Sequence, residues 1–313
     1  MFWIFKKRKK DTASSSSKPV PSSFDDPNKA DLEIKQVGPY EIIAPIGSGG
    51  MGTVYKAIDK ARDKEVAVKV LHPKYDEDPK RRKQDFLGRE VMIAASLNHP
   101  NIIKMEKDIY ETIDKMGRGR RCIVMEYIDG YNLKKHIEGR DLTIQQMIDI
   151  CIKLCHGLDY LHQNGIVHRD VKPANFLFSK DGKQVKIVDF GLSKTTDWTQ
   201  WFTKEAGGTR VYMSPEQLLK KSLDARSDIF SFGITMYELF SGRHPCEGND
   251  AHQISRQILD PNYKFIPPSN YNPEVTPALD RIILKCLRRK LEHRYQSMTE
   301  LILDLTRATK SRI

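Results

Sequence analysis

The chain has 313 residues, of which 39% are hydrophobic and 30% are charged, and its net charge at pH 7 is +11. This length and balance predict one large globular domain or two small ones. No run approaches the ~20 apolar residues that a membrane span needs, and the five cysteines occur singly rather than in a disulfide or zinc-binding pattern. We therefore expect reduced thiols and a cytoplasmic location. The positive charge favours acidic partners, but no nucleic-acid-binding module is evident, so a nucleic-acid partner is not expected.

The N-terminal region differs in composition from the rest of the chain. Residues 1–10 read MFWIFKKRKK, and residues 11–37 are rich in Ser, Pro, Asp and Lys. Two interpretations of residues 1–10 stay open: weak peripheral contact with an anionic membrane surface, or a disordered basic tail. The composition of residues 11–37 predicts a disordered linker. We therefore expect residues 1–37 to precede a folded domain at 38–308.

Residues 40–128 have mostly strand-like patterns. Four segments rich in β-branched and apolar residues predict strands at 41–46, 53–57, 66–71 and 122–127. A helix is expected at about 82–97, ending before Pro100. The segment 114–121 lengthens the turn before the last strand.

From residue 129 onward the pattern is mostly helical. Thr143 and Gln146 form a capping box, and an apolar stripe follows it as far as Leu161. Residues 229–242 are apolar on nearly every face, which predicts a buried helix ending at Gly242. The two halves predict a small sheet-rich lobe and a larger helical lobe, with a ligand site between them.

A glycine-rich segment, IGSGGMGTV, contains Gly47, Gly49 and Gly52, followed by Val54. Dinucleotide-binding folds use the same spacing, but there the glycines open a helix. Here they lie between two predicted strands, where backbone N–H groups can approach phosphates without a Cβ in the way. The alternative is a flexible hairpin with no ligand.

Lys69 stands at the end of an apolar strand, and Glu90 lies on the predicted helix with Phe86, Ile93, Ala94 and Leu97 on the same face. A glutamate on a buried face is costly unless it is paired. We therefore expect an ion pair between Lys69 and Glu90 that holds the ammonium for a phosphate. The alternative is a lysine whose stem packs while its head reaches water.

The segment IVHRDVKPANFLF places Asp170, Lys172 and Asn175 between apolar flanks, and Asp189 follows another apolar strand. Carboxylate and amide oxygens beside a phosphate-binding loop suit Mg²⁺, with Mn²⁺ as an alternative metal. Structural polar residues closing a turn would explain one such loop, but would explain two poorly.

These motifs occur together with GTRVYMSPE in a fixed order, and over about residues 40–308 the chain resembles eukaryotic-type (Hanks-type) serine/threonine protein kinases, bacterial members most of all. The resemblance implies an α+β, two-lobed protein kinase fold. A small N-lobe of antiparallel sheet plus one helix (about 38–127) would cover a mainly helical C-lobe (about 128–308), with ATP in the cleft. The implied activity is transfer of the ATP γ-phosphate to Ser/Thr hydroxyls of proteins, including the chain's own activation segment.

The resemblance also implies roles for residues of the site. Asp170 would deprotonate the substrate hydroxyl, and Lys172 would steady the transferring phosphoryl group. Asn175 and Asp189 would hold Mg²⁺, while Lys69, fixed by Glu90, would grip the α- and β-phosphates. The residues expected around the nucleotide are Ile46, Gly47, Gly49, Gly52, Val54, Ala67, Met125, Glu126, Ile128 and Leu177.

Regulation is implied by other positions. Arg169 precedes the catalytic Asp, so an anion in segment 190–215 would pair with it; Thr199 and Thr203 are the candidate phosphosites, and Glu205 would supply part of that charge without phosphorylation. Thr209 favours Ser/Thr acceptors, and Glu216 would pair with Arg294.

Ser214, Phe230 and Asn132 depart from the usual residues of the family, Asn132 at the ribose position. Two rival interpretations are a nucleotide-binding pseudokinase and a small-molecule kinase. The presence of Lys69, Asp170, Asn175 and Asp189 argues against the first, and the GTRVYMSPE segment argues against the second.

Overall fold

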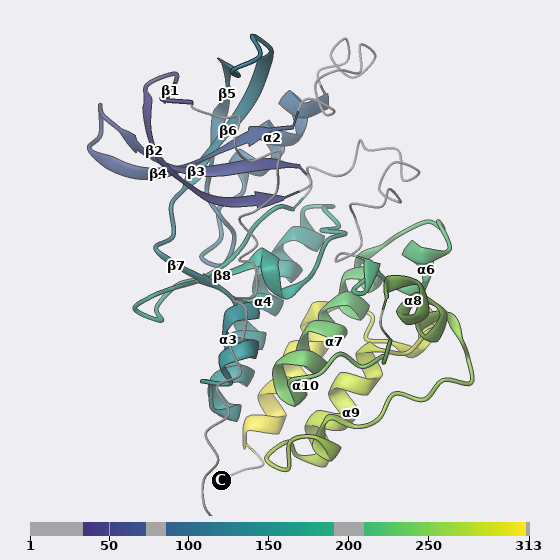
Figure 1. Cartoon of the computed structure of the whole chain (residues 1–313). Helices are drawn as coiled ribbons and strands as arrows, with labels where there is room; N and C mark the ends of the chain where they lie inside the picture. The colour runs from purple at the N-terminus through teal and green to yellow at the C-terminus, as the bar shows by residue number, and fades with distance from the viewer. Residues whose placement is uncertain (1–33, 50, 73–85, 191–209, 249, 311–313) are drawn as a thin grey trace, which may run out of the picture.

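The computed structural model describes residues 34–49, 51–72, 86–190, 210–248 and 250–310, which form a sheet-rich lobe and a helical lobe (Figure 1). The predictions for residues 1–10 and for Thr199, Thr203, Glu205 and Thr209 lie outside the described residues. Within the described ranges, no helix combines the length and apolar character needed to span a membrane.

An antiparallel sheet of six strands, in the order β1-β2-β3-β4-β6-β5, forms the N-lobe. Its strands are β1 (Gln36–Val37), β2 (Tyr40–Gly49), β3 (Gly52–Asp59), β4 (Lys64–Leu71), β5 (Met105–Ile113) and β6 (Gly119–Glu126). The four predicted strands are confirmed. The predicted linker boundary at residue 37 is too late, because Val37 is fully buried and pairs with Tyr40. β6 also begins earlier than predicted, so residues 119–121 belong to the hairpin with β5 rather than to a turn.

Side chains of β4 alternate between two sides of this sheet, as the period of a strand requires. Val66, Val68 and Val70 pack into a cluster confined to the N-lobe, whereas Ala67 and Leu71 join a cluster that continues into the C-lobe. Lys69 has the same parity as Ala67 and Leu71, so its side chain belongs to the side that faces the other lobe.

The helix of the N-lobe, α2 (Phe86–Ser96), buries Val91, Ala94 and Ala95. The prediction that Ile93 shares the buried face is wrong, because Ile93 is 49% exposed. Apolar residues occupy more than one stripe of this helix, so spacing alone cannot decide which stripe packs inward. The observed rotation places half-buried Glu90 at the edge of the packed face rather than at its centre.

A small antiparallel sheet, β7-β8-β9, lies where the lobes meet. Its strands are β7 (Gly130–Asn132), β8 (Phe176–Ser179) and β9 (Val185–Ile187). A parallel bridge between Ile102 and Ile187 ties β9 to the segment that follows α2. The pair β8 and β9 positions the two predicted catalytic segments, because residues 168–175 precede β8 and Asp189 follows β9.

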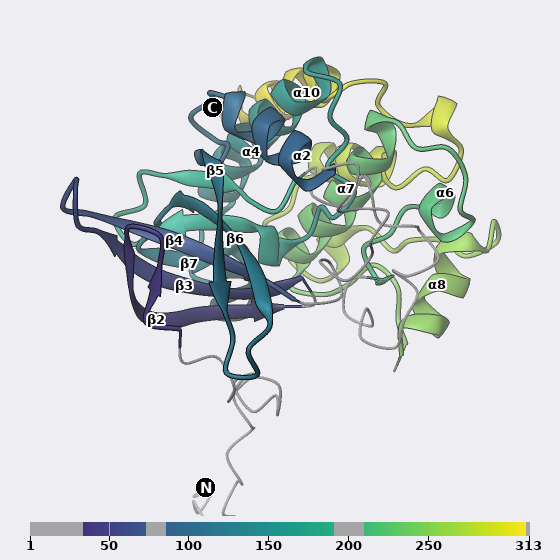
Figure 2. The same cartoon turned by 90° about the horizontal axis from the view of Figure 1, so that it is seen from above.

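The C-lobe packs its helices around α7 and α4 (Figures 1 and 2). The helices are α3 (Leu133–Gly139), α4 (Ile144–Gln163), α6 (Pro215–Leu218), α7 (Ala225–Ser241), α8 (Ala251–Leu259), α9 (Pro277–Cys286) and α10 (Met298–Lys310), with 3₁₀ turns η3 (Pro173–Asn175), η6 (Pro268–Asn270) and η7 (Leu291–His293). The predicted Thr143–Gln146 capping box is confirmed, and α7 is buried along most of its length and ends at Gly242 with φ of 69°.

Candidate active site

The glycine-rich segment forms the hairpin between β2 and β3, with Gly47 opposite Val54 and Gly49 opposite Gly52. A Cβ at Gly47 or Gly49 would meet nothing within 4 Å, so these two glycines leave open space beside the strand. Gly52 has φ of 150°, and a Cβ there would lie 2.1 Å from the Val70 carbonyl oxygen. Gly52 is therefore needed for close packing of β3 on β4, whereas Gly47 and Gly49 suit close approach of a ligand.

Lys69 is 3% exposed, and its Nζ lies 2.6 Å from Asp189 Oδ1 and 4.0 Å from the Met51 sulfur. The expected Lys69–Glu90 pair is therefore not present: the ion pair of Lys69 within the described chain is with Asp189. The reason is positional, because Asp189 leaves β9 with φ of 59°, pointing its carboxylate at the ammonium, while Glu90 lies at the edge of the α2 face. Glu90 instead contributes to the charges around Arg169.

Asp189 carries opposing influences on its ionisation. Burial favours the neutral acid, but Lys69, Lys172 and His168 outweigh it and lower the pKa of the Asp189 carboxyl. The side chain is 32% exposed. An ionised, partly accessible carboxylate is what a divalent cation requires.

The catalytic-loop residues are held together by short polar contacts. Lys172 Nζ lies 2.9 Å from Asp170 Oδ2, and Asn175 Nδ2 donates to the same oxygen at 3.0 Å and to the Asp170 carbonyl at 2.7 Å. Asp170 Oδ1 is buried and accepts no hydrogen bond from the residues that the structure describes. A buried carboxylate oxygen without a donor is costly, so this atom is placed to receive a hydroxyl from a ligand.

Asp228 in the first turn of α7 anchors the catalytic loop, and sequence reasoning missed it. It is 1% exposed and accepts from the backbone N–H groups of His168 and Arg169 at 2.8 Å each. His162 Nε2 lies 2.8 Å from the same carboxylate. Burial opposes ionisation, yet these partners lower the pKa of Asp228. The available signal was an acidic residue in an otherwise apolar helix, which must have partners.

Arg169, the predicted regulatory arginine, is held in the left-handed region with φ of 68°. Its carbonyl accepts from Gln217 Nε2 at 2.8 Å. Burial lowers the pKa of the guanidinium, and the charges of Asp228 and Glu90 oppose that effect. The arginine therefore lies between the catalytic loop, α2 and α6.

The predicted adenine-pocket residues come from both lobes and join one apolar cluster. Ala67 and Met125 are buried cross-strand neighbours, and Val54, Ile128 and Leu177 pack partly buried against that cluster. The Glu126 side chain accepts from the Lys104 N–H at 2.7 Å and pairs with Lys186 at 2.8 Å. Because the side chain is engaged there, a contribution of this residue to a nucleotide would come from its backbone. Ile46 is 43% exposed beside Gly47.

Metal binding can be tested against the donor set. The Asn175 amide nitrogen is engaged by Asp170, which assigns its amide oxygen to the opposite side, and Asp189 supplies an ionised carboxylate. Two hard oxygen donors completed by phosphate oxygens match the preference of Mg²⁺. The residues present therefore fit a magnesium–nucleotide site.

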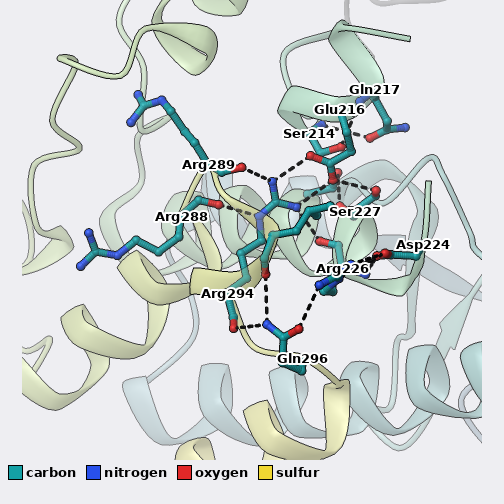
Figure 3. Close-up of polar contacts among 12 residues, drawn as sticks. Ser214, Glu216, Gln217, Asp224, Arg226, Ser227, Arg288, Arg289, Arg294 and Gln296 are labelled. Atoms are coloured by element: carbon teal, nitrogen blue, oxygen red, sulfur yellow. Dashed lines mark hydrogen bonds and ion pairs between the residues drawn. The ribbon is translucent and has the colours of Figure 1, made fainter. Parts of the chain in front are cut away.

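The predicted pair of Glu216 and Arg294 is confirmed as a buried, bidentate contact with both N–O distances at 2.8 Å (Figure 3). Ser227 Oγ donates to Glu216 at 2.7 Å, and Arg294 also donates to the carbonyls of Arg226 and Arg289. Burial opposes ionisation, but Arg294 keeps the pKa of Glu216 below its usual range. The contact joins α6 to η7 across the start of α7.

The three departures from the family pattern have structural roles here. Ser214 is the N-cap of α6 in a capping box with Gln217. The Phe230 ring lies under the Arg294 guanidinium at 4.9 Å. Asn132 is the N-cap of α3 and accepts from the Lys135 N–H.

Tyr212, in the segment after residue 209, is held from two sides. Its hydroxyl donates to Glu238 Oε2 at 2.7 Å, and its ring packs against His244 at a centroid distance of 6.1 Å. Burial raises the pKa of Glu238 to about 7, although Tyr212 and Lys134 oppose the shift. A tyrosine anchored to α7 holds this segment against the C-lobe.

Fold and site together define a protein kinase. The sheet-rich lobe carries a glycine-rich hairpin and the buried Lys69. The helical lobe carries the anchored loop with Asp170, Lys172 and Asn175, and Asp189 lies beside it. The chain belongs to the protein kinase family: the model of the protein kinase domain matches residues 40–304.

Named relatives are bacterial serine/threonine kinases. The chain is 38% identical over 272 residues to the probable serine/threonine-protein kinase SCO3848 of Streptomyces coelicolor and 38% identical over 277 residues to the serine/threonine-protein kinase PknB of Mycobacterium tuberculosis, with 86% of this chain covered in each case. The aligned parts span 39% and 42% of those relatives' lengths. The crystal structure of the Mycobacterium tuberculosis PknI kinase domain has the same fold, with a TM-score of 0.65, 24% identity, and coverage of 87% of this chain and 97% of that one.

Proposed function

We propose that this chain transfers the γ-phosphate of ATP to serine and threonine hydroxyls of protein substrates, with Mg²⁺ as the metal. The observation that carries the proposal is the Asp170 carboxylate: one oxygen is held by Lys172 and Asn175, and the other is buried with no donor among the described residues. This geometry suits a base that receives a hydroxyl proton. The relation to bacterial serine/threonine kinases supports the same activity.

Each residue of the site has a role in this proposal. Lys69 neutralises phosphate charge from the N-lobe, and Gly47 and Gly49 let backbone N–H groups approach the phosphates. Asn175 and Asp189 would hold the metal, which when bound neutralises charge that develops on the phosphate oxygens. Lys172 supplies a cation at the Asp170 carboxylate, where the acceptor hydroxyl would lie.

The substrate hydroxyl would donate to Asp170 Oδ1, and Asp170 would accept its proton as the oxygen attacks phosphorus. Asp228 fixes the backbone of His168 and Arg169, so the carboxylate does not have to reorganise during this step. Protein substrates would be presented by the segment that contains Tyr212. The separately folded unit would include β1 and extend to about residue 308, with the residues before it acting as a tether.

The test is phosphate transfer from labelled ATP to the chain itself and to a generic Ser/Thr protein substrate, for wild type and Asp170→Asn. Loss of a positioned base lowers the rate by about 10² to 10⁴, while nucleotide affinity should stay within about twofold because Asp170 is not a phosphate ligand. Equal transfer by the two proteins would reject the assignment. Acid-stable label on tyrosine rather than on Ser/Thr would reject the acceptor class.

A further inference from the structure

A hollow lies outside the candidate active site, next to Glu126 at the end of β6. It has a volume of about 490 Å³. Three lysines line it, Lys153 from α4, Lys183 from the β8–β9 turn and Lys186 from β9, together with Glu126, Pro100 and Val185. We call this hollow the lysine groove.

Positive charge in the lysine groove exceeds the negative charge that faces it. Lys186 is neutralised by Glu126 at 2.8 Å. Lys153 is exposed and has no ion-pair partner in the described ranges of the chain, and Lys183 makes a long contact of 3.5 Å with exposed Asp181. Two of the three ammonium groups are therefore available to a partner.

Shape and lining select the class of ligand. The lysines come from α4 and from the β8–β9 hairpin, and the groove that they line has a volume of about 490 Å³, more than one compact anion fills. Among the described residues that line the groove, none is aromatic, so a nucleobase has no stacking partner. Exposed Pro100 supplies an apolar contact beside the charges, with Val185 buried beneath the surface. This combination complements an extended acidic peptide with an apolar side chain between its carboxylates.

We propose that the lysine groove docks an acidic segment of a protein partner, in which an apolar residue rests on Pro100 while carboxylates pair with Lys153 and Lys183. Use of this docking for substrates rests on the proposed kinase function, but the binding does not. The groove shares Glu126 with the segment expected to contact adenine, and Lys186 is three residues before Asp189. Docking would therefore tether a substrate to the same rigid elements that carry the nucleotide site.

The test is fluorescence anisotropy of the full chain with a short labelled peptide in which Leu is flanked by Asp and Glu, compared with a twin peptide carrying Asn and Gln instead. The variant is Lys153→Glu with Lys183→Glu. The matched control is Lys64→Glu with Lys290→Glu, which makes the same charge change at two exposed lysines away from the groove. We expect the groove variant to weaken acidic-peptide binding by about tenfold or more, and the control by less than about twofold. The milder Lys153→Gln with Lys183→Gln replaces the groove variant if the charge reversal impairs folding.

Three results would overturn the proposal: equal binding of the acidic and neutral peptides, equal losses in the groove and control variants, or displacement of the peptide by inorganic tripolyphosphate at an equal concentration, which would show recognition of charge alone. A kinetic arm separates docking from catalysis. For a Ser/Thr peptide extended by the acidic segment, the groove variant should raise KM by about tenfold and leave kcat within about twofold. Peptide binding without phosphorylation by any variant would reject the kinase function and leave the groove standing.

Discussion

Lys69 and Asp189 form an ion pair at 2.6 Å that joins β4 of the N-lobe to the second residue after β9. The pair is asymmetric, because the lysine side chain is 4% exposed and the aspartate side chain is 32% exposed. The cost of losing a partner therefore differs between the two residues, since a buried charge left alone is penalised far more than one that water can reach.

We expect Asp189→Ala to lower the free energy of unfolding by about 3 kcal/mol, because the Lys69 ammonium is left buried. Lys69→Met should lower it by less than about 1.5 kcal/mol, since methionine fills the same volume and Asp189 stays partly solvated. Urea unfolding of the three proteins measures both values. Lys56→Met, at the more exposed Lys56–Glu65 pair, is the control and should leave the urea midpoint nearly unchanged. The reverse order of the first two variants would contradict the asymmetry.

The Glu216–Arg294 contact gives a second prediction. Arg294→Lys keeps the charge but loses the two-pronged geometry and the donors to the carbonyls of Arg226 and Arg289. We expect a loss of about 3 kcal/mol in the free energy of unfolding. Arg226→Lys is the control, because its pair with Asp224 is partly exposed and should be worth less than about 1 kcal/mol. Similar losses in both variants would show that burial of the pair has no energetic weight.

Gly52 and Gly49 of the hairpin should differ in their effects on stability and on ATP binding. Gly52→Ala should destabilise the protein by about 2 kcal/mol or more, because the new Cβ would meet the Val70 carbonyl in a backbone conformation that alanine disfavours. Gly49→Ala should change stability by less than about 0.5 kcal/mol, since its surroundings are open. If the hairpin covers phosphates, the Gly49 variant should nevertheless raise the KM for ATP. Thermal unfolding measures the stability of both variants, and ATP kinetics on the same samples measure the KM.

The half-buried Glu238 predicts a dependence of stability on pH. Burial raises its pKa from 4.5 to about 7 in the folded protein, so between these values the folded state binds the proton and the unfolded state does not. Stability from this group is full below about pH 4.5 and declines as the pH rises through 7, by about 2–3 kcal/mol in total.

The measurement is urea unfolding of wild type and Glu238→Gln at pH 5 and pH 8. The difference in stability between the two proteins should shift in favour of the variant at pH 8, because glutamine has no proton to lose. Tyr212→Phe removes a donor that favours the charged carboxylate, so it should steepen the decline. A difference independent of pH would show that Glu238 is ionised throughout this range.

Sequence patterns were sufficient for features set by short-range chemistry. The glycine-rich hairpin, the strand that carries Lys69 and the Thr143 capping box depend on residues close together in the chain, and all three are present. The Glu216–Arg294 pair was predicted from the family resemblance. The two residues are far apart in the sequence, so their spacing gives no indication that they are partners.

The sequence did not predict features that depend on how a helix is rotated about its axis or on contacts between residues far apart in the chain. The apolar positions of α2 allow more than one inward face, so the Lys69–Glu90 pair expected from spacing gave way to Lys69–Asp189. β1 has one buried residue, Val37, within a polar stretch, so the average composition of that stretch does not indicate a strand. Asp228 could be flagged as a buried acid, but its contacts with His168 and Arg169 require knowing which loop crosses the start of α7.

Ser227 and Asp228 are consecutive residues of α7, yet they attach different parts of the enzyme: Ser227 holds Glu216 at the start of α6, and Asp228 holds the backbone before Asp170. A single peptide unit thus sets the spacing between the backbone before Asp170 and the start of α6. A movement of the N-lobe that changed the Lys69–Asp189 distance would leave that spacing unaltered. Under the proposed function, phosphate binding by Lys69 would therefore be adjustable while the loop that carries Asp170 stays in place.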